Sequence, residues 1–262
     1  MNKKSFHFSK ALSSTFKLIC KHPVQMLLPA LVVIALTLPY QYFNLKFGSP
    51  NTTISPDYSI TGSLTIFARL YTEMILQYFL IFLLAYIQFI VFCGYVRIIS
   101  KWVDSNVEPS LKDYLILDFE LFGKYLGVGF IYMILMGFGF LFFVIPGFVM
   151  MTLYNLCFVV LIDRKSGFRS ALGISDKLVS GVMWEFFGFL LLSGLFLSGP
   201  NFYLAFNYSY FKHIELFVPI LIITVITTLL SPLIQLTHIF LYKDLSAQQD
   251  EIDALKKEQI QA

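Results

Sequence analysis

The run YLGVGFIYMILMGFGFLFFVIPGFVMMTLYNLCFVVLI, Tyr125–Ile162, decides the fold of this chain because it contains no charged residue. A membrane-crossing helix needs about 20 apolar residues to span about 30 Å of hydrocarbon. The 38 residues of the run are too many for one span and enough for two. Proline fits the first turn of a helix and glycine accepts turn geometry, so Pro146 and Gly147 predict a hairpin turn between the two spans.

The composition of the whole chain agrees with membrane insertion. Of its 262 residues, 57% are hydrophobic, 18% aromatic and only 13% charged, and the mean hydropathy is +0.74. Soluble domains carry about 25% charged residues. No basic stripe interleaved with aromatic residues lies on a soluble segment, which excludes a nucleic-acid-binding role.

Four further apolar runs predict four more spans. The sequence therefore predicts an all-α integral membrane protein in which residues 1–262 form a single membrane domain with six transmembrane helices. The predicted spans cover approximately residues 23–43, 74–99, 125–143, 146–162, 186–206 and 216–241, with a charged cytoplasmic tail at 243–262.

The distribution of basic residues predicts the orientation. Sixteen of the 19 lysines and arginines lie before the first span, after the second, after the fourth or after the sixth, and only Lys46, Arg69 and Lys212 lie on the other side. The positive-inside rule then places both termini in the cytoplasm. A loop at 44–70 is expected on the opposite face.

The three cytoplasmic segments that precede the hairpins share a helical spacing of apolar residues. In the first, Phe8, Leu12 and Phe16 recur at this spacing; the second starts with Ser110 and Asp113 as a capping box; the third extends over 168–182. Together they predict three repeats, each an amphipathic interfacial helix followed by a transmembrane hairpin.

Basic residues occupy the polar sides of these segments and form a basic collar at the cytoplasmic surface. Such helices serve either as simple anchors or as a surface that binds anionic lipid headgroups or a protein partner. The collar residues are Lys10, Lys17, Lys112, Arg164, Lys165, Arg169 and Lys177.

Polar residues follow one face of the sixth predicted span and form a polar stripe of Thr224, Thr228, Ser231, Gln235 and His238. Such a stripe faces other helices or a wet cavity, so it serves either helix packing or an intramembrane path that Gln88 and Asn155 would complete. The spans lack a central acidic or basic residue, which argues against ion-coupled pumping.

Glycines at 123, 127 and 129 predict a close approach of the third span to a neighbouring helix. Catalytic motifs are missing: the sequence has no GxSxG, HExxH, P-loop or dinucleotide-binding fingerprint. The four histidines and three cysteines show no metal-ligand spacing. We therefore expect no catalytic residues, no metal and no cofactor, and we expect the protein not to be an enzyme.

The stretch VIPGFVMMTLYNLCFVVLIDRKSGFRSALGISDKLVSGVMWEFF, Val144–Phe187, resembles the YciC-like bacterial inner-membrane proteins, which are related to the membrane domain of some glycerophosphodiester phosphodiesterases. The resemblance rests on Pro146 and Gly147, the charged step 163–165, Gly167 and the Ala171-Leu172 pair. It implies a multi-pass protein of the bacterial inner membrane, without catalysis, because the hydrolase barrel of the fused proteins is missing.

Two functions follow as hypotheses. The first is a non-enzymatic membrane protein whose basic collar binds anionic lipid or a membrane-protein partner, including a second copy of the chain, in envelope homeostasis. The alternative is a transporter or flippase that moves a lipid-like or small apolar substrate along the polar stripe.

Overall fold

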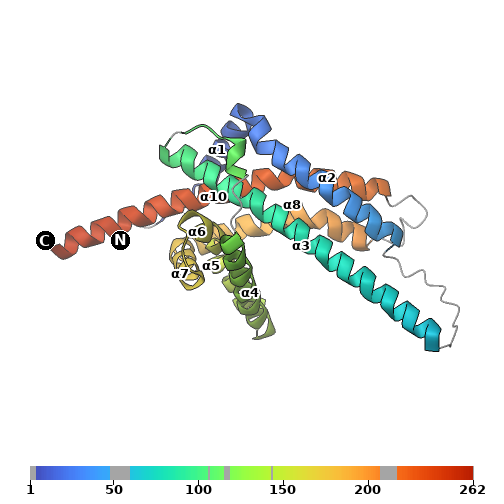
Figure 1. Ribbon diagram of the computed structural model, residues 1–262. Coiled ribbons are helices and arrows are strands. Elements are labelled where there is room, and N and C mark those ends of the chain that lie inside the picture. The colour runs from blue at the N-terminus through green and yellow to red at the C-terminus, as the bar shows by residue number, and fades with distance from the viewer. Residues whose placement is uncertain are drawn as a thin grey trace.

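The computed structural model describes residues 4–47, 60–105, 107–114, 119–142, 144–206 and 217–261. Over these residues the protein is all-helical, as the sequence predicts (Figure 1). The helices, in chain order, are α1 (Phe8–Lys21), α2 (Pro23–Phe47), α3 (Ile60–Ser105), the short 3-10 helix η1 (Leu111–Tyr114), α4 (Phe119–Phe142), α5 (Val144–Tyr154), α6 (Cys157–Asp163), α7 (Phe168–Val179), α8 (Met183–Phe206) and α10 (Phe217–Gln261).

Several helices are long and apolar enough to cross a membrane. Four segments of the described chain qualify on their own, and up to six qualify if each of two sharply bent helix pairs counts as one span. The large exposed side chains on α4, α8 and the membrane part of α3 are mainly aromatic or aliphatic, as expected for surfaces that contact lipid. The protein is therefore a multi-helix membrane protein.

Two right-angled corners connect short helices to long ones. α1 meets the first part of α2 at 92°, and α7 meets α8 at 106°. At the first corner, the His22 N–H closes α1 by donating to the Leu18 carbonyl, and Pro23 starts α2, because proline is favoured at the first helical position. Both short helices bury one side at helical spacing: Ala11, Thr15 and Leu18 in α1, and Ala171, Ser175 and Leu178 in α7.

α4 and α5 form a tight hairpin, but the chain reverses earlier than the sequence predicts. α4 ends at Phe142 and α5 starts at Val144, so Pro146 and Gly147 lie in the first turn of α5 rather than at the tip. Proline is tolerated in a first turn, and it therefore marks the start of the helix here. Gly147 lies directly against Gly139, and a Cβ added to Gly139 would lie 2.7 Å from the Gly147 Cα.

The segment before α4 differs from the predicted second amphipathic helix. Residues 107–110 are not helical, Leu111–Tyr114 form a single 3-10 turn, and the rest of the predicted segment before α4, at 115–118, lies outside the described residues. Ser110 caps this turn, since its hydroxyl accepts a hydrogen bond from the Lys112 N–H at 3.3 Å. The turn is held by Tyr114, whose ring packs on Gly94 of α3 and whose hydroxyl donates to the Gln25 carbonyl of α2 at 3.0 Å.

Two helices are longer than their predicted spans. α2 continues to Phe47 and α3 starts at Ile60, so the expected loop at 44–70 is largely helical, and its remainder at 48–59 lies outside the described residues. α10 does not end at the predicted membrane exit near 241 but continues through the charged tail as one helix to Gln261. In Figure 1 this extension leaves the bundle at the end where both termini lie.

α10 is the central helix of the fold. It packs against α1, α2, α3, α7 and α8. Many fully buried side chains lie in its last apolar turns, where Leu236, Ile239 and Tyr242 belong to one hydrophobic cluster with Tyr95 and Ile99 of α3 and the buried residues of α6. The core therefore lies at the end of the membrane helices that carries the charged segments, and the functional residues gather there.

Candidate functional site

A buried carboxylate connects three helices where α6 ends. Asp163 accepts hydrogen bonds from the Ser100 hydroxyl of α3 and, at 2.7 Å, from the Tyr242 hydroxyl of α10. Its Oδ1 lies 3.1 Å from the Lys243 Nζ, and the two side chains are only 14% and 12% exposed. An ion pair removed from water in this way needs additional hydrogen bonds, and the two hydroxyls supply them.

Asp163 does not cap the next helix, although it lies shortly before it. α7 starts after Gly167 and has no side-chain cap, whereas both Asp163 oxygens point to α3 and α10. α6 ends because Lys165 adopts a left-handed conformation, with φ at 46°, which is the usual way to close a helix, although glycine is the usual residue there. Arg164 turns to α10, where it donates to the Ser246 hydroxyl at 2.8 Å.

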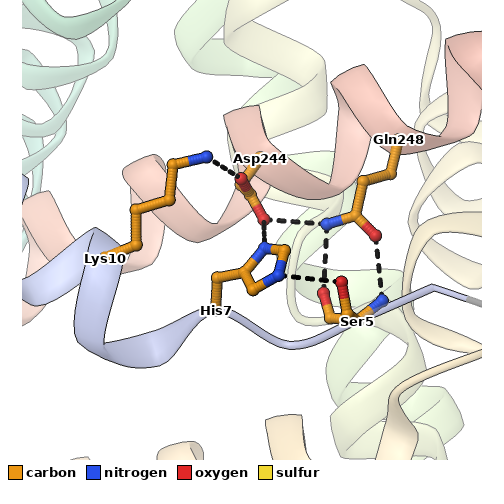
Figure 2. A network of polar contacts seen from close by, with 5 residues as sticks. All are labelled: Ser5, His7, Lys10, Asp244 and Gln248. Carbon is orange, nitrogen blue, oxygen red and sulfur yellow. Dashed lines mark hydrogen bonds and ion pairs between the residues drawn. The ribbon is translucent and has the colours of Figure 1, made fainter.

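A second polar network fastens the N-terminal segment to the extension of α10 (Figure 2). We call it the N-terminal latch, and it consists of Ser5, His7, Lys10, Asp244 and Gln248. Lys10 Nζ and His7 Nδ1 each lie 2.9 Å from a different oxygen of Asp244. Gln248 donates to the same carboxylate at 2.8 Å and exchanges two hydrogen bonds with the backbone of Ser5.

Three residues of the latch, Ser5, His7 and Asp244, contact one another in the same order as the serine, histidine and aspartate of a hydrolase triad. The Ser5 hydroxyl lies 2.9 Å from His7 Nε2, and His7 Nδ1 faces the Asp244 carboxylate, which is the sequence of contacts that activates a catalytic serine. A hydrolase also needs N–H groups directed at the developing oxyanion. The Ser5 N–H is instead committed to Gln248 Oε1 at 2.9 Å, and Lys10 neutralises the same aspartate, so the geometry favours a structural latch.

Two further contacts join the N-terminal segment to the rest of the bundle. The Lys4 ammonium donates to the carbonyls of Lys177 and, at 3.2 Å, of Leu178, where a cation stabilises the negative end of α7. Thr15 of α1 and Thr237 of α10 bring their buried hydroxyls to 3.1 Å. The start of the chain therefore bridges α1, α7 and α10.

The collar residues lie on α1, on η1 and on the α6–α7 segment, and they fall into two groups. Lys10 is ion-paired with Asp244, and Arg164 contacts Ser246 and lies 3.9 Å from Asp250. The other collar residues are exposed and form no ion pair with another residue that the structure describes: Lys17, Lys112, Lys165, Arg169 and Lys177. These five retain their charge for an external partner.

Only part of the polar stripe is connected by hydrogen bonds between described side chains. Ser231 accepts a hydrogen bond from Gln235 Nε2 at 2.9 Å, Thr224 is buried, and the side chain of Thr228 lies outside the described part of the chain. The His238 ring packs between Phe186 and Phe189 of α8. Gln88 and Asn155, which the sequence predicts to complete an intramembrane path, do not join the stripe. Gln88 is exposed on α3, and Asn155, at the break between α5 and α6, forms a side-chain hydrogen bond with Tyr132 of α4.

The glycines of the third predicted span do not form, with any described residue, the close helix contact that their spacing predicts. A Cβ added to Gly123 or Gly127 would meet no atom of the described residues within 4 Å, and one added to Gly129 would meet only the Phe158 ring, at 3.8 Å.

Among the described residues, no group of three His, Cys, Asp or Glu side chains could hold a metal ion. The charged networks above gave no local sequence signal, since the contacts that join different elements link residues between 63 and 243 positions apart.

The latch predicts a dependence on acid pH. Asp244 lies beyond the apolar part of α10; burial opposes its ionisation, but hydrogen bonds from Lys10 and His7 outweigh burial and lower its pKa. Because the folded pKa lies below the unfolded value, the latch contributes fully above the unfolded pKa and is lost as pH falls through the folded one. Hydrogen exchange of residues 5–11 should therefore rise steeply only in strong acid.

The matched variant for this test is Asp244→Asn. It should show fast exchange of residues 5–11 at neutral pH and no further acid step, since the titrating group is gone. If the wild-type protein and this variant exchange equally at neutral pH, Asp244 does not hold the N-terminal segment.

The fold and the charged layer define a class: an all-helical, multi-span membrane protein with a polar assembly at one end of its helix bundle. None of the known protein families, curated proteins or solved structures compared with this chain matches it.

Proposed function

We propose that this chain is a non-enzymatic, six-span protein of the bacterial inner membrane, akin to the YciC-like proteins, whose basic collar binds anionic lipid headgroups or a protein partner at the cytoplasmic surface. Both termini lie in the cytoplasm in this proposal, as the excess of basic residues on that side favours. The role that fits is maintenance of membrane or envelope organisation.

One observation carries the proposal: two helices that meet the next span nearly at right angles present unpaired basic residues. α1 and α7 bend by 92° and 106° to the helices that follow, so when α2 and α8 cross the bilayer, α1 and α7 lie along its surface. Lys17 on α1 and Arg169 and Lys177 on α7 are exposed. Each basic residue near an anionic membrane surface contributes about 1 kcal/mol.

The test compares two double variants that remove the same charge. Arg169→Gln with Lys177→Gln removes two collar charges, whereas Lys256→Gln with Lys257→Gln removes two exposed charges from the extension of α10. At about 1 kcal/mol per residue, the collar variant should lose roughly 30-fold of its preference for phosphatidylglycerol over phosphatidylcholine. Native mass spectrometry of the lipids retained by the purified protein measures this preference.

High salt should reduce the wild-type preference, because exposed charges are screened. Equal lipid retention by the two double variants would contradict a collar of this kind. Loss of lipid preference in both variants would instead point to a general effect of net charge.

A second candidate, a transporter or flippase for a lipid-like or small apolar substrate, is favoured by two orphan atoms in the polar stripe. Gln235 Oε1 and His238 Nε2 are buried and have no hydrogen-bond partner among the described residues, and a buried polar atom without a partner costs free energy unless water or a ligand satisfies it. This candidate would be excluded if the cysteine introduced by Ser231→Cys never reacts with a water-soluble thiol reagent.

A further inference from the structure

A cavity of about 360 Å³ opens between α1, α3 and α10, next to the N-terminal latch. Lys10 and Ser14 line it from α1, Trp102 from α3, and Phe240, Lys243 and Asp244 from α10. The rings of Trp102 and Phe240 meet edge to face with centroids 5.7 Å apart. Its volume lies within the range of small-ligand sites, and its lining combines an apolar wall with charges of both signs.

The cavity has donors that could hold a phosphate group. An ammonium group offers three hydrogen-bond donors; Lys10 uses one of them on Asp244, and its side chain is 70% exposed. The Ser14 hydroxyl forms no hydrogen bond with another described residue. Lys243 is already held by Asp104 and Asp163, so it contributes fixed positive charge to the wall.

Next to the lining residue Val103, and outside the lining itself, Asp104 provides an acceptor that could hold a primary amine. Asp104 is fixed beside the cavity by the 2.9 Å ion pair with Lys243, which lines the wall, and the Asp104 side chain is 57% exposed. A carboxylate accepts about four hydrogen bonds, and Lys243 takes only part of this capacity. The ammonium groups of Lys10 and Lys243 are paired with three carboxylates, those of Asp244, Asp104 and Asp163, so the site and its ion-pair partners have no net positive charge to favour an anion.

The depth of the cavity matches the lipid headgroups. Trp102 follows the buried apolar turn that ends at Ile99, and Phe240 lies in the last apolar turn of α10 before Lys243. Tryptophan concentrates at the boundary between hydrocarbon and water. A ligand with a phosphate and an amine, attached to an acyl chain that leaves toward the membrane, satisfies the charges and the depth together.

We propose that this cavity binds the phosphoethanolamine headgroup of a membrane phospholipid, with its phosphate at Lys10 and Ser14 and its amine at Asp104. Phosphatidylethanolamine fits better than phosphatidylcholine because a carboxylate hydrogen-bonds a primary ammonium but not a quaternary one. It fits better than phosphatidylglycerol because the charges of the site offer no net attraction to an anion. Of the seven collar residues only Lys10 belongs to this site, and the five collar residues without an ion pair among the described residues lie outside the cavity lining.

The test uses the full-length protein in detergent with Trp184→Phe, which leaves Trp102 as its single tryptophan. Mixed micelles containing phosphatidylethanolamine, phosphatidylcholine or phosphatidylglycerol with the same acyl chains are titrated in, and O-phosphoethanolamine is titrated in separately. We expect a saturable change in Trp102 emission with phosphatidylethanolamine, and the other lipids should need at least about tenfold higher concentrations to produce the same change.

Matched variants locate the site. Lys10→Gln should weaken phosphatidylethanolamine binding about tenfold, whereas Lys17→Gln, which makes the same change on the same helix outside the cavity, should leave it unchanged. Asp104→Asn should weaken phosphatidylethanolamine and strengthen phosphatidylglycerol. Ala247→Leu, which fills the cavity from α10, should abolish binding with the charges intact and keeps the test valid if a charge variant fails to fold.

Three results would overturn the proposal. The first is a change in Trp102 emission that saturates at an equal or lower concentration of phosphatidylcholine or phosphatidylglycerol than of phosphatidylethanolamine in the wild-type protein. The second is identical binding by Lys10→Gln and Lys17→Gln. The third is tight binding of free O-phosphoethanolamine that the lipid does not displace, which would identify a soluble ligand. Arg169→Gln with Lys177→Gln, which removes collar charges outside the cavity, should leave the Trp102 response to phosphatidylethanolamine unchanged, so failure of the collar proposal is distinguishable from failure of this one.

Discussion

Asp163→Ala is expected to destabilise the protein by about 3 kcal/mol, since it breaks a largely buried ion pair and leaves two hydroxyl donors without their acceptor. The substitution leaves Lys243, which is 12% exposed, with Asp104 as its remaining ion-pair partner among the described residues, and removes the acceptor of the Ser100 and Tyr242 hydroxyls. α6 would lose its polar connection to α3 and α10 in one step. The change in unfolding free energy can be measured by reversible unfolding in mixed micelles.

The control for this prediction is Asp250→Ala. Asp250 is 70% exposed and lies 3.9 Å from Arg164, so its removal should cost less than about 1 kcal/mol. The double variant Asp163→Ala with Lys243→Met should lose less stability than the sum of the two single variants, because both buried charges are removed. Equal effects of Asp163→Ala and Asp250→Ala would show that Asp163 does not connect the helices.

Gly139→Val should separate the α4–α5 hairpin and lower the unfolding free energy by about 2 kcal/mol or more. A Cβ at this position would lie 2.7 Å from the Gly147 Cα and 2.9 Å from its backbone nitrogen. Backbone atoms cannot turn away as a flexible side chain can, so the helices themselves must move apart. Unfolding in mixed micelles and the rate of proteolysis near residue 143 would report the change.

Gly137→Val is the matched control on the same helix. A Cβ at Gly137 meets no atom of the described chain within 4 Å, so this substitution should be close to neutral or slightly stabilising, since glycine is a poor helix former. Equal destabilisation by the two valines would show that the contact between Gly139 and Gly147 does not hold the hairpin.

The helical membrane architecture could be predicted because it depends on local pattern. Apolar runs of sufficient length gave the all-helical membrane class, and the helices at Phe8–Lys21 and Phe168–Val179 form where apolar residues recur every three or four positions. The same reasoning failed for the segment that begins at Ser110. Tyr114 bonds to Gln25 and packs on Gly94, and these long-range contacts override the helical period.

The close helix approach illustrates a second limit of the sequence. Gly123, Gly127 and Gly129 have the spacing associated with helix contacts, yet the backbone contact occurs between Gly139 and Gly147. The spacing of glycines on one helix does not show which of its faces meets a neighbour. That face is set here by the position of the chain reversal after Phe142, one turn earlier than Pro146 suggested.

The polar networks could not be predicted because their members are distant in the sequence. Ser100, Asp163 and Tyr242 belong to three helices, and the latch joins Ser5 and His7 to Asp244 and Gln248. Each residue alone looks like an ordinary surface or boundary residue. Only the packing of α3, α6 and the N-terminal segment around α10 brings them together.

The unbroken course of α10 has a mechanical consequence. The helix continues 20 residues beyond Leu241 to Gln261, and at 1.5 Å per residue this extension is about 30 Å long. Membrane helices adjust to bilayer thickness by tilting, and a tilt of about 5° would displace the far end of such an arm by roughly 2–3 Å. α10 is thus a rigid arm that pivots at the layer of Asp163 and Asp244. A change in membrane thickness that tilts the helix therefore moves its far end through the surrounding water.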